Sequence, residues 1–141
     1  MRADSVDNDL MDSGYSGTPQ LKKLGFKDAA RWDLVGASSD WRFESEPNAE
    51  GRTPTGALDV LLAFFRRAAD LDAQVGALAE RVRPAGALWV AWPRKAAGHS
   101  SDITENYVRE VVLPRGLVDV KVAALDTDWS ALKIVWRVGV R

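Results

Sequence analysis

The chain has 141 residues, of which 46% are apolar and 28% charged, with a formal net charge of −1 at pH 7. A chain of this length buries about two-thirds of the surface that its unfolded form exposes, so one domain with one core is expected. Because the sequence has no cysteine, it excludes disulfides, a thiolate nucleophile and cysteine-ligated zinc or iron–sulfur sites.

The charges are distributed unevenly along the sequence. Residues 1–80 hold nine basic and 14 acidic side chains, whereas residues 81–141 hold ten and six. A basic C-terminal half suits a binding face for anions, although a solvated surface is the simpler interpretation. Dedicated nucleic-acid binders usually have a strongly basic domain, so we do not expect nucleic acid to be the partner.

The N-terminal residues predict a tail. Residues 1–13 are acidic and lack periodicity, which predicts a flexible segment ahead of a single domain over residues 14–141. They also lack the basic and long apolar regions of a secretory signal. The longest apolar runs, at 60–65 and 87–92, fall short of the roughly 20 residues that span a bilayer. We therefore expect a cytoplasmic protein without a membrane partner.

The first predicted helix follows a glycine-rich segment. Residues 14–17 place a serine between glycines but follow no strand, so they do not form the nucleophile elbow of hydrolases. A structural or an anion-binding role stays open for this loop. Thr18 as N-cap and Pro19 in the first helical position predict a short helix, and Gly25 can end it.

The next segment predicts one strand and a long connection. Residues 31–35 form a strand closed by Gly36, and residues 38–43 predict one or two helical turns. Residues 44–56, rich in Glu, Pro, Gly and Thr, predict a surface loop. We expect at most one short strand between Gly36 and the next clear element.

Periodicity becomes clear after residue 57. Residues 58–65 are almost continuously apolar, as in a parallel strand that is covered on both faces. Residues 87–92 repeat this pattern and are closed by Pro93. Between the two strands an apolar stripe predicts an amphipathic helix, formed by Leu71, Val75, Leu78 and Val82. Leu62, Leu78 and Val90 are the residues that we expect to be buried.

The C-terminal part predicts a helix and a hairpin. Asp102 and Glu105 have the spacing of a capping box at a helix start. Strands at 117–125 and 132–138 are separated by residues 126–130, too few for a parallel crossover and therefore a hairpin. The whole pattern predicts a three-layer α/β sandwich whose mostly parallel sheet ends in this antiparallel hairpin.

Several short motifs between Gly14 and Arg137 occur together and resemble a family of short bacterial proteins, known only as the domain of unknown function numbered 3052. The motifs are GYSGTP at 14–19, KLG at 23–25, WVAWPRK at 89–95, DITEN at 102–106, VR at 108–109, GLVD at 116–119, KV at 121–122 and WSAL at 129–132. The family itself implies no function.

The C-terminal half also resembles the class I methyltransferases that use S-adenosylmethionine. Residues 58–60 resemble the start of their fourth strand and residues 82–88 the turn into their fifth. Those enzymes bring a glycine-rich turn to the cofactor and place an acidic residue after the second strand. Here Gly36 is the single glycine of that turn. The resemblance implies a trimmed Rossmann-like fold with Gly36 as its one cofactor-binding candidate, and we expect S-adenosylmethionine to bind weakly or not at all.

The side chains that often carry chemistry have simpler interpretations here. The sole histidine, His99, lies in a predicted loop and is expected on the surface, although a general base is conceivable. Trp32, Trp89 and Trp136 lie in predicted strands and are expected in the core. No His, Asp or Glu pair has metal-ligand spacing, so we predict no metal.

The best candidate site is topological, since ligands of open α/β sheets bind outside the carboxyl ends of the parallel strands. The residues that we expect at this edge are 36–40, Arg66 with Arg67, 93–95, Asp102 and the hairpin at 126–130. We predict a pocket for a small anion near Arg94 and Lys95, which can form charge-assisted hydrogen bonds. The proposed neutral donors and the apolar wall are Ser100, Ser101, Thr104 and Trp129. In the alternative interpretation, Arg94 and Lys95 pair with nearby carboxylates and only fix the loop.

Three functions remain open from the sequence. The first is a small-molecule binding protein, for an anion or a nucleotide-like ligand, on a degenerate methyltransferase-like fold. The second is an active methyltransferase that uses S-adenosylmethionine through an unusual turn. The third is a protein–protein interaction module. The single glycine of the turn favours the first of these over the second.

Overall fold

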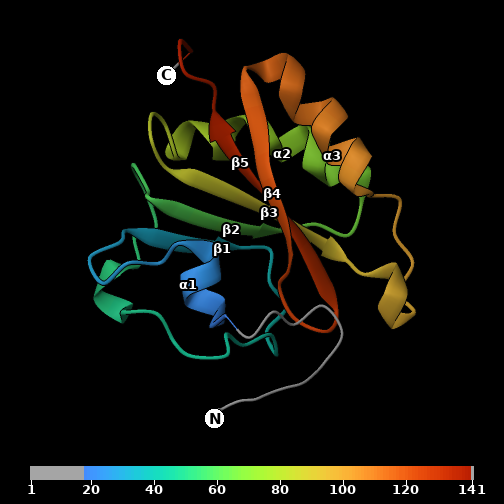
Figure 1. The fold of residues 1–141 in the computed structure, drawn as a ribbon, viewed down its shortest axis with the longest axis horizontal. Coiled ribbons are helices and arrows are strands. Elements are labelled where there is room, and N and C mark those ends of the chain that lie inside the picture. The colour runs from blue at the N-terminus through green and yellow to red at the C-terminus, as the bar shows by residue number, and fades with distance from the viewer. Residues whose placement is uncertain (1–17, 141) are drawn as a thin grey trace.

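The computed structural model describes residues 18–140. It contains a mixed β-sheet in the order β1-β2-β3-β5-β4 (Figure 1). The strands are β1 (Trp32–Val35), β2 (Val60–Phe64), β3 (Ala87–Pro93), β4 (Leu117–Ala124) and β5 (Trp129–Trp136). β1, β2 and β3 are parallel, and β5 is antiparallel to both β3 and β4. The predicted fold class and its C-terminal hairpin are confirmed. The predicted tail and the 14–17 loop lie outside the described residues.

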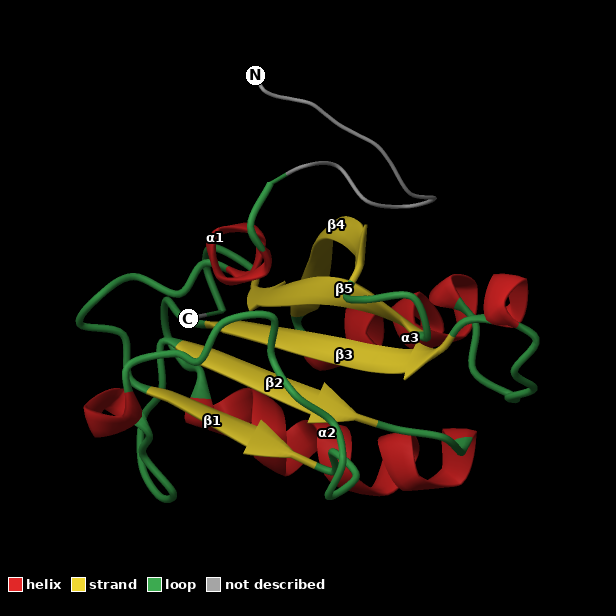
Figure 2. Cartoon of the chain, turned by 90° about the horizontal axis from the view of Figure 1, so that it is seen from below, coloured by secondary structure: helices red, strands yellow, loops and turns green. Residues whose placement is uncertain are grey.

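Helices cover both faces of the sheet unequally. The helices are α1 (Gln20–Leu24), α2 (Ala68–Arg81) and α3 (Glu105–Val112), with 3-10 turns η1 (Ala49–Gly51), η2 (Lys95–Ala97) and η3 (Leu113–Arg115). α2 and α3 pack on one face, and Figure 2 shows α1 on the opposite side of the sheet from α2. The α1 face is completed by the irregular segment 36–56. The third layer is therefore thin.

The continuous apolar runs form the central strands β2 and β3. Their apolar residues suit strands that are covered on both faces. Every residue of β2 and β3 is buried, as are the tryptophans predicted for the core, Trp32, Trp89 and Trp136. Leu62 and Val90 are fully buried as expected, but Leu78 is only half-buried. The stripe of α2 that faces the sheet continues through Ala79 instead, so the prediction for Leu78 was wrong.

Two predicted helix starts are wrong. The N-cap of α1 is Pro19 rather than Thr18. At α3 the cap is Thr104, whose side chain accepts a hydrogen bond from the Tyr107 N–H. Asp102 instead accepts a hydrogen bond of 2.7 Å from the backbone N–H of Ala68, at the start of α2. Its carboxylate therefore caps a helix 34 residues earlier in the chain.

Two further predictions differ from the structure. Residues 38–43 contain a single turn, in which the Trp41 N–H donates to Ser38 O, and no helix. The segment contributes Phe43 to the core, where its ring packs edge-on against Trp32 and Trp41. Packing of these aromatic rings decides the path of this segment. The last strand also begins at Trp129 and ends at Trp136, earlier than predicted at both ends.

Polar contacts attach α1 to the sheet. The buried side chain of Gln20 donates to Leu125 O (2.9 Å) and accepts from the Glu44 N–H (3.0 Å). The indole of Trp89, at the centre of the sheet, donates to Leu24 O (2.9 Å) at the end of the helix. A helix of five residues has little stability of its own, so these contacts and the burial of Leu24 hold it in place.

Candidate functional site

A cavity of about 440 Å³ lies at the carboxyl edge of the parallel strands, where sequence reasoning expected a ligand. The segment after β1, the residue after Phe65, the end of β3 and the β4–β5 hairpin all contribute to it. Its lining includes Ser38, Asp40, Trp41, Arg42, Arg66, Pro93, His99, Asp126, Asp128 and Trp129. Segments far apart in the sequence thus meet at one place.

Asp126 connects two walls of this cavity. One carboxylate oxygen accepts a hydrogen bond of 2.9 Å from the indole N–H of Trp41. The other accepts from the backbone N–H groups of Asp128 (2.8 Å) and Trp129 (2.9 Å). One side chain therefore holds the segment after β1 against the hairpin and fixes the orientation of the Trp41 ring.

Arg66 is one of the two arginines of the lining. Its guanidinium lies 4.8 Å from the ring centroid of Trp129, which in turn packs edge-on against Phe64. Within the part of the chain that the structure describes, this guanidinium makes no hydrogen bond or ion pair. The stacking contact orients it without using its N–H groups. Arg66 therefore presents donors to the cavity that a ligand can use.

Two carboxylates of the lining, Asp40 and Asp128, accept hydrogen bonds that lower their pKa values. His99 Nε2 donates to Asp128 Oδ1 at 2.9 Å, and this hydrogen bond lowers the pKa of Asp128 below its ordinary value. The hydroxyl of Ser38 does the same for the pKa of Asp40. His99 is exposed and connects the segment after β3 to the hairpin. Each carboxylate retains further lone pairs that can accept hydrogen bonds.

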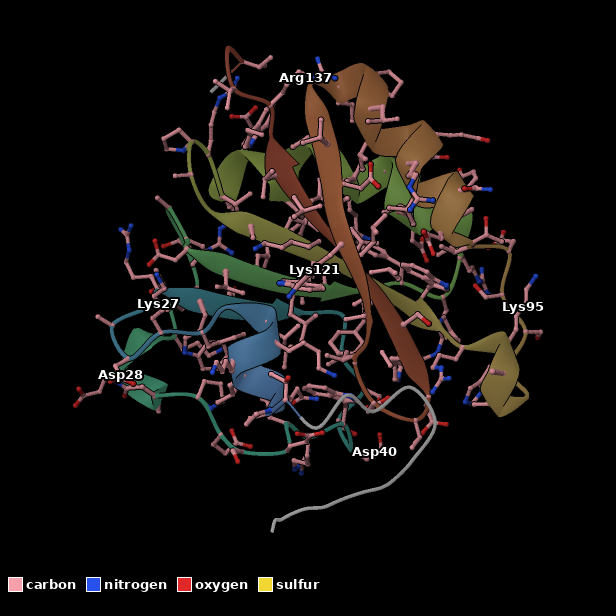
Figure 3. All side chains as sticks on the ribbon, in the orientation of Figure 1. Lys27, Asp28, Asp40, Lys95, Lys121 and Arg137 are labelled. Carbon is pink, nitrogen blue, oxygen red and sulfur yellow. The ribbon has the colours of Figure 1, made fainter. Side chains whose placement is uncertain are left out.

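The six residues predicted to bind an anion do not converge on this cavity. Arg94 donates to the hairpin carbonyls of Asp126 (3.4 Å) and Thr127 (3.2 Å), so it fixes the hairpin through backbone oxygens. Lys95 is exposed on η2, and Figure 3 shows it at the outer side of that turn. Arg94 and Lys95 thus neither line this cavity nor form a hydrogen-bonded ion pair with a carboxylate of the described residues.

The predicted neutral donors mostly serve the backbone. Ser101 donates to Arg66 O (3.0 Å) and accepts from the Ile103 N–H (3.1 Å), and Thr104 caps α3. Ser100 is exposed. Of the six predicted residues, all within the described part of the chain, Trp129 alone lines the cavity.

Gly36 has a structural reason to be glycine. Its φ is +79°, and a Cβ built on it would lie 2.5 Å from Phe64 O. The turn after β1 therefore approaches the end of β2 too closely for any side chain. Gly36 lines a neighbouring hollow of about 370 Å³ rather than the cavity itself.

Sequence reasoning placed Arg66 and Asp126 at this edge but selected neither as a ligand-binding residue, and it missed Trp41. Arg66 could have been found from its position, because it follows the buried strand β2 almost directly. Trp41 had only one local signal, a large aromatic residue in an otherwise polar segment. The contact between Trp41 and Asp126 spans 85 residues and leaves no local pattern.

The described residues show two further absences. They contain no group of three or more His, Asp or Glu side chains that could hold a metal ion. None of their helices has the length and apolar character needed to cross a membrane.

Comparison with known proteins gives a fold but no family. No family model and no curated protein sequence matches the chain, so its resemblance to the family numbered 3052 stays a prediction. Among solved structures, magnesium protoporphyrin IX methyltransferase from Synechocystis with bound S-adenosylmethionine has a TM-score of 0.46 at 15% identity. That alignment covers 58% of this chain and 40% of the enzyme, so the chain spans well under half of it.

Two other structures are more similar in fold. A protein of the NADB-Rossmann superfamily from Streptococcus agalactiae has a TM-score of 0.52 at 8% identity, covering 89% of this chain and 71% of that one. Fibrillarin, in its complex with Nop5p, has a TM-score of 0.51 at 12% identity, covering 83% and 79%. The chain is thus similar to these two proteins in architecture alone, and its fold is a reduced, Rossmann-like α/β fold.

Proposed function

We propose that the chain is a small-molecule binding protein and that it holds an anionic or nucleotide-like ligand in the carboxyl-edge cavity. The observation that carries the proposal is Arg66, a guanidinium oriented by Trp129 whose N–H groups have no partner among the described residues. A guanidinium binds phosphate or carboxylate through two parallel hydrogen bonds. A cavity of about 440 Å³ has the size of a small-molecule site.

The other lining groups restrict the ligand. Asp40 and Asp128 are ionised, so they repel a second anionic group and favour hydroxyl or amine donors away from Arg66. Trp41, fixed by Asp126, provides an aromatic wall. These features favour a molecule with one anionic group, a flat or apolar middle and several hydroxyl groups, as nucleotide-like compounds have.

A thermal-shift panel of nucleotides, phosphates and carboxylates tests this assignment. We expect at least one of these anions to raise the melting temperature of the wild type, because a ligand that binds only the folded state stabilises it. Arg66→Met keeps the contact with Trp129 largely apolar but removes the charge, and is expected to abolish the shift. Lys95→Met is the matched control, since Lys95 is a cation near the same edge that does not line the cavity. Equal shifts in Arg66→Met and wild type would contradict the proposal.

We also predict that S-adenosylmethionine binds with a dissociation constant weaker than about 10 μM, which corresponds to about 7 kcal/mol. Gly36 is needed for the approach to Phe64 O. β1 is the edge strand of the sheet among the described residues, so they contain no strand beyond it to carry a ribose-binding acid. Isothermal titration calorimetry measures this affinity. A tighter constant would favour the methyltransferase hypothesis instead.

A further inference from the structure

A second cavity lies at the opposite, amino edge of the sheet. Its volume is about 510 Å³, and it is bordered by the end of α1, the first residues of β2 and β3, and the last part of β5. Its apolar wall is formed by Leu24, Val60, Ala87 and Val135. The carboxyl-edge cavity lies at the other ends of β2 and β3, so the two cavities share no lining residue.

Two lysines line this cavity, and a third lies opposite one of them in the sheet. Lys27 and Lys133 line the cavity. Lys121 is directly opposite Lys133 in the β4–β5 pair, and its ammonium lies 5.9 Å from the ring centroid of Trp89. Lys27 and Lys121 are seen on either side of α1 in Figure 3. Within residues 18–140 none of these ammonium groups has a hydrogen bond or an ion pair.

The charge at this edge is not balanced by the acidic and carbonyl groups around it. Asp59, the one carboxylate of the cavity lining, accepts from the backbone N–H of Arg31 (2.9 Å) and lies 3.7 Å from its guanidinium. At the end of α1, Leu24 O accepts from the indole of Trp89. Like charges directly opposite on paired strands destabilise a sheet. Lys121 and Lys133 therefore add an unfavourable interaction, which an anion bound at Lys133 would relieve.

We propose that this amino-edge cavity binds an amphipathic anion, a molecule with an apolar chain or ring and one carboxylate or sulfonate group. The apolar body packs against Val60, Ala87 and Val135, and the anionic group accepts charge-assisted hydrogen bonds from Lys133 and Lys27. An inorganic anion would leave the apolar wall in water, and a neutral hydrocarbon would leave the lysines unpaired. The combination selects a ligand with both parts.

The test uses octanoate as the probe and isotope-labelled full-length protein. Titration followed by NMR is expected to shift the resonances of Val60, Ala87 and Val135. Octanol, which has the same chain without the charge, is expected to bind at least tenfold less tightly, because a hydrogen bond to a charged group contributes about 1.5–3 kcal/mol. Inorganic phosphate is expected to leave these resonances unchanged.

Two substitutions test whether Lys133 and Lys27 bind the anionic group of octanoate. Lys133→Met keeps the aliphatic stem on the strand and is expected to weaken octanoate binding about tenfold or more. Lys27→Met, at an exposed position outside the sheet, is expected to weaken it without affecting folding. Lys95→Met is the control and should bind octanoate like the wild type. Arg66→Met should also leave octanoate binding intact, which separates this site from the carboxyl-edge cavity.

Three results would overturn the proposal. They are the absence of shifts at Val60, Ala87 and Val135, equal affinity for octanol and octanoate, and octanoate affinities of Lys27→Met and Lys133→Met that match that of Lys95→Met. The melting temperature of each variant shows that it is folded.

Discussion

Replacement of Gly36 by alanine is expected to destabilise the protein by roughly 2–5 kcal/mol. The left-handed backbone at φ +79° costs a residue with a Cβ about 1–2 kcal/mol. The new Cβ would also lie 2.5 Å from Phe64 O, and relief of such overpacking costs about 1–3 kcal/mol. Because the obstacle is a backbone carbonyl of a buried strand, it cannot move aside as a flexible side chain would.

Gly98→Ala is the matched control for this substitution. Gly98 has a similar φ of +88°, but no atom lies within 4 Å of the position where its Cβ would be. Gly98→Ala is therefore expected to lower the free energy of unfolding by the backbone contribution alone, about 1–2 kcal/mol. Urea unfolding of the two variants measures both free energies. Equal losses would show that the approach of Gly36 to β2 is not what requires glycine.

Replacement of Asp33 by alanine is expected to lower the free energy of unfolding by about 3 kcal/mol. Asp33 lies in β1, is buried, and makes ion pairs with Arg52 Nε and Arg81 Nη1, each at 3.1 Å. Arg81 also donates to Thr53 O (2.8 Å) and Gly56 O (3.0 Å). Removal of one partner from a buried pair leaves the other charge uncompensated and costs about 3–5 kcal/mol. We take the lower value because the Arg52 side chain is 50% exposed.

The exposed ion pair of Arg83 with Glu80 provides the comparison. Its side chains are 34% and 59% exposed, and such surface pairs contribute about 0–1 kcal/mol. Glu80→Ala should therefore lower the free energy of unfolding much less than Asp33→Ala. Chemical denaturation monitored by tryptophan fluorescence distinguishes the two. A small effect at Asp33 would mean that Arg81 is held by the carbonyls of Thr53 and Gly56 alone.

The sequence predicted the central elements well because their signals are local. A strand such as β2 is apolar at every position, and this pattern needs no knowledge of its neighbours. Helix starts were harder to predict. Asp102 was assigned to the start of α3, whose cap is Thr104, but its carboxylate caps α2 instead. The boundary of a helix that is capped from a distant loop is invisible in its own residues.

The candidate site was predicted in location but not in composition. Parallel strands collect their following residues at one edge, which identified Arg66 and the hairpin as neighbours. Arg94 does not line this cavity, and its hydrogen bonds go to the backbone oxygens of Asp126 and Thr127, which any residue provides. Arg66 was not selected because the ring that orients it, Trp129, lies more than 60 residues later in the sequence.

The place of β1 at the edge of the shortened sheet has a consequence for solubility. An uncovered edge strand exposes backbone groups that can pair with another chain and start aggregation. Here Trp32 O accepts from the Thr53 N–H (2.8 Å), and the N–H and carbonyl of Leu34 are taken by the side chains of Asp33 and Arg52. The ion pair of Asp33 with Arg52 thus protects the sheet against strand addition. The β1 edge of the sheet is therefore a poor template for pairing with a second chain.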